Sequence, residues 1–139
     1  NVLGYKDANS VESNLKTANP VIDLMKDQKT VTEKGGTMRL GAYDCQLTLG
    51  SNSYNAYKNT EISERHRHRF EFNNNYKNEF ENSGMIFPGI NLKNNLVEII
   101  EIPTHPWFVG VQFHPEYKST VANPHPLFCG FIDACINNK

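Results

Sequence analysis

Residues 107–113, WFVGVQF, are the stretch that most limits how this chain of 139 residues can fold. Apolar side chains fall on both faces of an extended segment here, as in a central strand of a sheet that is covered on both sides. The stretch therefore predicts a buried central strand. It runs directly into His114, Pro115 and Glu116, so this strand ends by presenting a base and an acid.

The rest of the pattern predicts mostly strands, with few helices. Apolar residues three and four apart predict an amphipathic closing helix over residues 125–138, with Leu127, Phe128, Phe131, Ile132 and Cys135 on one face. A short helix is predicted over 76–84, with Gly84 at its end. Further strands are predicted over 21–25, 65–73, 85–90 and 96–102, and one or two over 37–49, with a turn at Gly35-Gly36. This order favours an α/β fold with an antiparallel extension.

Composition excludes several classes of partner. The formal net charge is −1, so no overall basic field would gather nucleic acid or an anionic membrane. No apolar run approaches the roughly 18 residues that a membrane span needs. The first residues also lack the basic start and apolar core of a signal peptide. We therefore expect a cytoplasmic protein that binds neither nucleic acid nor membranes.

Three cysteines, at positions 45, 129 and 135, form no zinc-binding spacing and indicate reduced thiols. Cys129 and Cys135 are expected to pack in the core from the closing helix. Cys45 lacks the small flanking residues of a nucleophile turn, so no nucleophile is expected in this chain. The opening Asn-Val-Leu-Gly is typical of the end of a helix, with Gly4 as its cap, and this predicts that the chain is a fragment.

The HPE motif can carry acid–base chemistry. Pro115 disfavours helical geometry for the preceding residue, so His114 is expected to be extended. In extended backbone, residues i and i+2 point the same way, which places His114 and Glu116 on one side. A carboxylate that orients a histidine is the base half of a nucleophilic triad. By itself the motif is weak, because an H-x-E at the end of a strand is more often a polar loop.

The stretch RHRHR, residues 65–69, puts its histidines on one face of a strand and its arginines on the other. Three interpretations are open. The charges are solvated or paired with nearby glutamates; an arginine binds a substrate carboxylate through its planar fork; or His66 and His68 bind a metal, with Glu71 or His114 completing the site.

Taken together, these motifs resemble a known family. The tail LVEIIEIPTHPWFVGVQFHPEYKSTVANPHPLFCGFI, residues 96–132, is similar to the end of a class I (triad-type) glutamine amidotransferase domain. The stretches GGTMRLG (35–41) and ERHRHRFEFNN (64–74) narrow the resemblance to the CTP synthase family, and DANSVE (7–12) resembles a segment just after that family's nucleophile helix. The resemblance implies an α/β sandwich around a mixed, mostly parallel sheet. Residues 1–139 would be the C-terminal part of the amidotransferase domain, without the nucleophile segment and the synthetase domain.

The resemblance also implies an activity and a site. The family hydrolyses glutamine and uses the ammonia for the ATP-dependent amination of UTP to CTP, in pyrimidine nucleotide biosynthesis. His114 matches the catalytic base and Glu116 the carboxylate that orients it. Glu12 matches the residue that holds the α-amino group of glutamine, and Arg69 the one that contacts its α-carboxylate.

For the full-length enzyme the resemblance implies ATP, Mg²⁺, UTP and GTP as ligands and a homotetramer. No cofactor and no metal are expected in this chain, which should be inactive alone. Two alternatives within the fold are another triad-type glutamine amidotransferase and a non-catalytic amidotransferase-like module. The alternative outside this fold is a metal-binding β-barrel, in which His66 and His68 would bind the ion.

Overall fold

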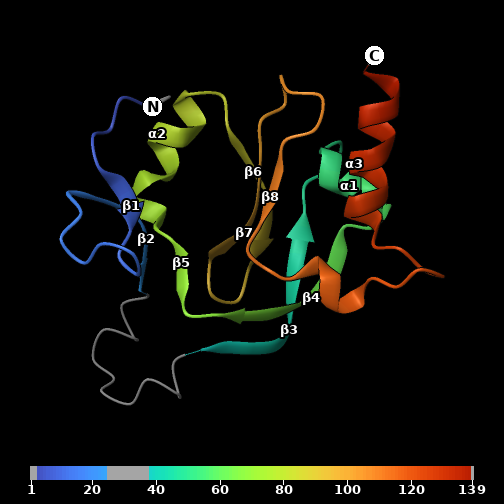
Figure 1. The fold of residues 1–139 in the computed structure, drawn as a ribbon, viewed down its shortest axis with the longest axis horizontal. Coiled ribbons are helices and arrows are strands. Elements are labelled where there is room, and N and C mark those ends of the chain that lie inside the picture. Colours follow the sequence, from blue (N-terminus) through green and yellow to red (C-terminus); the bar gives the residue numbers. More distant parts are fainter. Residues whose placement is uncertain (1–2, 25–37, 139) are drawn as a thin grey trace.

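The computed structural model describes residues 3–24 and 38–138, and within them the strands form two sheets (Figure 1). The smaller sheet has the order β1-β2-β5, with β1 Ala8–Ser10, β2 Asn19–Leu24 and β5 Phe70–Phe72. The larger has the order β4-β3-β6-β7-β8. Its strands are β3 Arg39–Leu47, β4 Glu61–His68, β6 Ile86–Asn91, β7 Leu96–Glu101 and β8 Val109–Val111.

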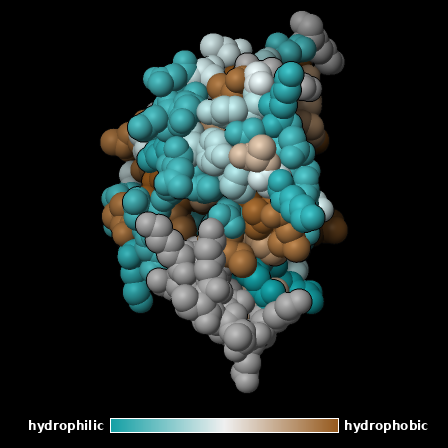
Figure 2. All heavy atoms as spheres, turned by 90° about the vertical axis from the view of Figure 1, so that its left-hand side faces the viewer, coloured by the Kyte–Doolittle hydropathy of each residue, from teal (hydrophilic) through white to brown (hydrophobic). Residues whose placement is uncertain are grey.

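The helices are short except for the last. They are α1 Asn52–Tyr57, α2 Lys77–Asn82 and α3 Pro126–Asn137, with single 3₁₀ turns at η3 Asn74–Tyr76 and η4 Pro115–Lys118. Figure 1 shows α3 beside α1, whereas α2 lies near β1 at the other side of the molecule. The face on that other side is mostly hydrophilic, with hydrophobic side chains gathered in a few places (Figure 2). None of the helices among the described residues is long and apolar enough to cross a membrane.

Most elements lie where the sequence pattern predicts them. The strands predicted over 21–25, 37–49, 85–90 and 96–102 are β2, β3, β6 and β7, although Met25 and Thr37 lie outside the described residues. Both predicted helices form, and Gly84 adopts a positive φ of 92° just after α2 ends. The predicted Gly35-Gly36 turn also lies outside the described residues.

The direction of the strands differs from the expected mostly parallel sheet. Among the described pairings only β1 with β2 is parallel, and all pairs of the larger sheet are antiparallel. The connections explain this difference. Parallel neighbours need a crossover of a dozen or more residues, whereas residues 92–95 and 102–108 are too short for one.

The strand predicted over 107–113 is shorter and less central than expected. β8 covers three residues and pairs with β7 at the edge of the larger sheet, as far as the described residues show. Trp107 lies before the strand, and its indole packs closely against α3. A Cβ added to Gly130 would lie 2.3 Å from Cη2 of Trp107, so only glycine fits beneath this ring.

The strand predicted over 65–73 is two strands. β4 begins earlier, at Glu61, and ends at His68, whereas Phe70–Phe72 joins β2 in the other sheet. Arg69 is the residue between them. The chain therefore turns from one sheet into the other at Arg69, and the alternation of polar and apolar residues continues across this break without marking it.

The core explains a wrong prediction about the cysteines. Its buried members are Cys45, Leu47, Ile99, Phe113 and Leu127. Cys129 and Cys135 are exposed rather than packed in the core. Only Leu127 among the predicted apolar face of α3 is buried, and the helix turns about 100° per residue, so Cys129 points to the side opposite Leu127. Spacing predicted an apolar face but not how much of it the sheet covers.

Candidate active site

A histidine and a glutamate meet just after β8. His114 has extended backbone geometry, with φ −112° and ψ 90°, and Pro115 opens the 3₁₀ turn η4 that carries Glu116. The His114 Nδ1 and Glu116 Oε1 atoms lie 2.7 Å apart. The hydrogen bond from His114 lowers the pKa of the Glu116 carboxyl. The structure thus brings together the two residues that the HPE motif singled out.

The contact fixes the chemistry of the imidazole. A carboxylate only accepts hydrogen bonds, so Nδ1 of His114 is the donor to Glu116 and Nε2 of the neutral ring is left to take a proton. The ring also stacks on Tyr117, with centroids 5.0 Å apart. Its backbone N–H donates to the carbonyl of Arg65 at 2.9 Å, which attaches this segment to β4. His114 is therefore an oriented base on a fixed backbone.

Glu12 and Arg69 line one cavity of about 500 Å³, although 57 residues separate them in the chain. The cavity lies where the two sheets approach each other at the β4–β5 corner. Its other lining residues are Ile22, Met38, Arg67, His68, Phe70 and Gln112. His114 is not among them, but it follows Gln112 by two residues. The acidic side chain of Glu12 and the cationic side chain of Arg69 thus line one cavity, beside the segment that carries the His114–Glu116 pair.

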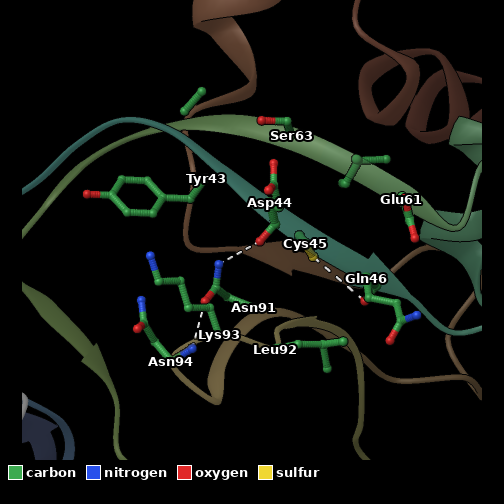
Figure 3. A pocket seen from close by; sticks show the side chains of 12 residues that line it. Tyr43, Asp44, Cys45, Gln46, Glu61, Ser63, Asn91, Leu92, Lys93 and Asn94 are labelled. Atoms are coloured by element: carbon green, nitrogen blue, oxygen red, sulfur yellow. Dashed lines mark hydrogen bonds between the residues drawn. The ribbon is translucent and has the colours of Figure 1, made fainter.

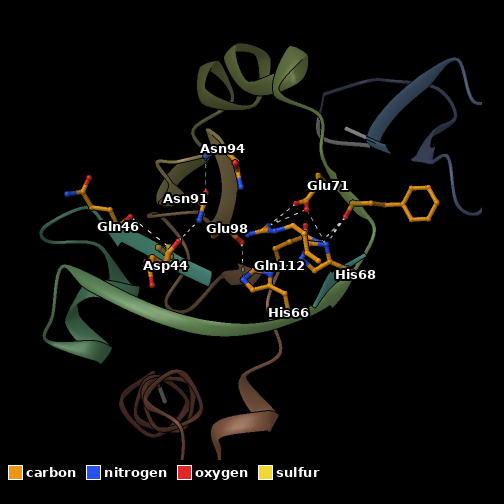
Figure 4. A network of polar contacts seen from close by, with 12 residues as sticks. Asp44, Gln46, His66, His68, Glu71, Asn91, Asn94, Glu98 and Gln112 are labelled. Atoms are coloured by element: carbon orange, nitrogen blue, oxygen red, sulfur yellow. Dashed lines mark hydrogen bonds and ion pairs between the residues drawn. The ribbon is translucent and has the colours of Figure 1, made fainter. Parts of the chain in front are cut away.

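Beneath this cavity lies a buried cluster of charged and polar residues (Figure 4). The Arg39 guanidinium donates to Glu98 at 2.7 Å and to Glu71 at 3.3 Å. Burial raises the pKa of both carboxyls, to about 7 for Glu71. His66 lies 3.5 Å from Glu98 across the cluster. The arginine compensates the charge of two acids that would otherwise be buried alone.

The two histidines of RHRHR face this cluster and bond to each other. His66 Nδ1 and His68 Nε2 lie 2.7 Å apart, and His68 Nδ1 lies 3.2 Å from the carbonyl oxygen of Phe70. Burial, and then the positive charge of Arg39, lowers the pKa of His66 to about 3 and that of His68 to about 4. Both rings are therefore neutral at pH 7. Facing nitrogens 2.7 Å apart leave no room for an ion between them, which argues against the metal interpretation.

Within the described residues, no group of three or more His, Cys, Asp or Glu side chains is arranged to hold a metal ion. On the histidine face, His66 and His68 bond to each other and His68 lies within hydrogen-bond distance of the Phe70 carbonyl, whereas His66 only lies near Glu98, at 3.5 Å. On the outer face Arg65 and Arg67 are exposed.

Another cavity, of about 730 Å³, lies between β3, β4 and the turn after β6 (Figure 3). It contains none of the predicted site residues. Asn91 spans its floor by donating to the carbonyl of Asp44 at 2.7 Å. Cys45 is among its lining residues, but burial raises the pKa of this thiol to about 12. The reactive form is the thiolate, so Cys45 is not an activated nucleophile.

Comparison with known proteins defines the class. The model of the glutamine amidotransferase class-I family matches residues 10–134. The chain belongs to this family. The predicted α/β fold of these amidotransferases is confirmed by a solved structure, the glutaminase domain of Trypanosoma brucei CTPS with bound acivicin. It has a TM-score of 0.88 and 33% identity, and the match covers 99% of this chain and 53% of that one.

Similar curated proteins include CTP synthases from several bacteria. That of Bacteroides fragilis is 60% identical over 137 residues, which are 99% of this chain and 26% of the relative. That of Christiangramia forsetii is 61% identical over 134 residues, or 96% of this chain and 24% of the relative. The chain thus spans about a quarter of the length of the CTP synthases that it matches.

Sequence reasoning missed three residues. Arg39 and Glu98 form the buried cluster, and Gln112 lines the cavity. One signal for them was present. Glu98 and Glu101 interrupt the otherwise apolar run 96–102, and a charge in such a run needs a buried partner. The partner of Glu98 is Arg39, 59 residues earlier, whereas Glu101 accepts from the N–H groups of Asn52 and Ser53 at the start of α1.

Proposed function

We propose that residues 1–139 are the C-terminal part of the glutaminase domain of a CTP synthase. The domain would hydrolyse glutamine and supply ammonia for the ATP-dependent amination of UTP to CTP. The single observation that carries the proposal is the 2.7 Å contact between His114 and Glu116 at the end of β8, in a chain of the glutamine amidotransferase class-I family. The CTP synthase relatives support the wider reaction.

The proposed chemistry uses a cysteine from outside residues 1–139. Nε2 of His114 takes the proton of that thiol, and the thiolate attacks the side-chain amide carbon of glutamine. His114 then gives the proton to the departing nitrogen, so ammonia leaves and a γ-glutamyl thioester remains. Next, His114 takes a proton from water, whose oxygen attacks the thioester carbon. The C–S bond breaks, glutamate is released, and the proton on His114 returns to the thiolate, which regenerates the thiol and the neutral base. Glu116 stabilises each imidazolium and holds its tautomer.

Glu12 and Arg69 would bind the other end of glutamine. A free amino acid carries one positive and one negative group on its α-carbon, and the cavity presents one acid and one arginine. The arginine fork matches the α-carboxylate, and the Glu12 carboxylate matches the α-ammonium group. We assign these roles because both side chains line the cavity beside the segment that leads to His114.

The remaining ligands belong to the longer protein. We propose that ATP, Mg²⁺ and UTP bind in a synthetase domain outside this chain, that GTP regulates the enzyme, and that it assembles as a homotetramer in the cytoplasm. No residue of this chain is assigned to these ligands.

Covalent labelling of the full-length protein tests the proposal. A glutamine-analogue electrophile should modify one cysteine outside residues 1–139 and abolish glutamine hydrolysis. Cys45, Cys129 and Cys135 should remain unmodified in the peptide map, and excess glutamine should protect the labelled site. Labelling of Cys45, Cys129 or Cys135 that follows the loss of activity would contradict the proposed division of the site.

A further inference from the structure

The carbonyl oxygen of Phe70 accepts hydrogen bonds from two side chains, one at the end of β4 and one just after β8. Gln112 Nε2 donates to it at 3.1 Å, and His68 Nδ1 lies 3.2 Å away. Phe70 directly follows Arg69 at the corner where the chain leaves one sheet for the other. The two donors therefore hold the peptide next to the arginine of the proposed glutamine cavity.

The tautomer of His68 follows from its partners. A carbonyl oxygen only accepts, so Nδ1 of His68 must donate to Phe70, and Nε2 of the neutral ring must accept from His66. Behind His66 lie Glu98 and the Arg39 guanidinium. The ring of His68 is thus bonded at both nitrogens and cannot turn away from Phe70 without leaving a buried nitrogen unpaired.

Gln112 is also held in place by hydrogen bonds, and it links the β4–β5 corner to His114. Its backbone N–H donates to the carbonyl of Glu98 at 2.9 Å, and two residues later the N–H of His114 donates to the carbonyl of Arg65. The segment 112–114 is therefore bonded to β7 at one end and to β4 at the other. The side chain of Gln112, labelled in Figure 4, donates from this segment to the carbonyl of Phe70.

We propose that Gln112 is a positioning residue that sets the distance between Arg69 and His114. Its side-chain amide holds the corner that carries Arg69, while its backbone belongs to the segment that carries His114. When Arg69 holds the α-carboxylate of glutamine, the side-chain amide of the substrate then lies at a fixed distance from His114. The inference rests on the proposed function, because it assigns the cavity to glutamine.

The test uses Gln112→Met in the full-length protein. Methionine has nearly the same length and removes only the hydrogen-bonding amide. Gln112→Glu keeps the size and replaces the donor NH₂ with oxygen, so it serves as a second variant. Gln46→Met is the matched control, because Gln46 is an exposed glutamine on β3, away from the cavity. Steady-state glutamine hydrolysis is measured for each, together with the melting temperature.

We expect both Gln112 variants to raise the KM for glutamine about tenfold, the effect of one lost hydrogen bond at a partly buried carbonyl, with kcat changed less than threefold. Gln46→Met should leave both constants unchanged. In an Arg69→Ala background, Gln112→Met should lower kcat/KM by less than about twofold further, because the arginine that it positions is gone.

Full additivity of the Gln112 and Arg69 substitutions would overturn the positioning role. So would a fall in kcat at constant KM, or an unchanged KM in both Gln112 variants. Absence of glutamine hydrolysis in the unsubstituted full-length protein is a different result, which overturns the proposed function and this inference with it.

Discussion

Nδ1 of His114 and Oε1 of Glu116 lie 2.7 Å apart on either side of Pro115, with both side chains partly open to solvent. The proline keeps His114 extended and starts the 3₁₀ turn. This one residue therefore orients His114 and also brings Glu116 back toward its ring. The pair is thus determined locally, by three consecutive residues.

Replacing Glu116 by glutamine tests the role of this contact. Glu116→Gln keeps the shape but offers an amide where a carboxylate accepts from Nδ1, so the imidazolium loses its stabilising charge. We expect kcat for glutamine hydrolysis to fall about 10- to 1000-fold in the full-length protein, with KM nearly unchanged. Glu79→Gln, at an exposed position of α2, is the control. Equal rates for Glu116→Gln and the unsubstituted protein would remove Glu116 from the mechanism.

The cavity residues should act on binding rather than on turnover. Arg69→Lys keeps the charge but loses the fork, and Glu12→Gln loses the charge that attracts an ammonium group. We expect each to raise the KM for glutamine about 10- to 100-fold, with a smaller change in kcat. Arg65→Lys, on the exposed face of β4, should have no effect on either constant. If Arg65→Lys proved as harmful as Arg69→Lys, the cavity would not be the glutamine site.

Acid should weaken the buried cluster through its histidines. Burial lowers the pKa of His68 to about 4, below the ordinary value of 6.5 in the unfolded chain. Between pH 6.5 and 4 the unfolded chain therefore binds a proton that the folded chain does not, and this term of the unfolding free energy falls as pH falls. Glu71 has the opposite sign, since its pKa is raised to about 7. The other charged or titratable groups that act on this ring are Arg39, His66 and His114.

A variant isolates the histidine term from these neighbours. His68→Asn keeps a donor near Phe70 but does not titrate. The difference in unfolding free energy between parent and variant should shrink by about 1.4 kcal/mol per pH unit from pH 6.5 toward pH 4, and stay constant above pH 7.5. Urea unfolding at several pH values measures it. A difference that is the same at pH 4.5 and 7.5 would show that His68 titrates alike in both states.

Local sequence patterns predicted some parts of this molecule well. The HPE geometry follows from a proline rule that acts on neighbouring residues, and the apolar runs 85–90 and 96–102 follow from burial of side chains along a strand. Arg69 was chosen among the arginines of RHRHR through the family resemblance; it lines the cavity, and its role in binding stays a prediction. The alternation around it predicted one continuous strand and concealed the corner that places Arg69 between two sheets.

Other parts depend on contacts between distant segments. Glu98 meets Arg39 across 59 residues, and Gln112 meets Phe70 across 42. A local sequence pattern carries no information about which distant residues meet. The buried cluster and the contact of Gln112 with Phe70 could therefore not be predicted. Cys129 shows the same limit on α3, where the spacing indicated an apolar face but the sheet buries only Leu127.

The most direct test compares two nitrogen sources in a His114→Ala variant of the full-length protein, with His105→Ala, an exposed histidine in a turn, as the control. CTP formation is measured from UTP and ATP with either glutamine or ammonium chloride. We expect His114→Ala to abolish the glutamine-dependent reaction and to leave the ammonia-dependent reaction within about twofold of the unsubstituted protein, because only the glutaminase step needs the base. An equal loss of both reactions, or full glutamine-dependent activity without His114, would contradict the assignment of His114 as the catalytic base.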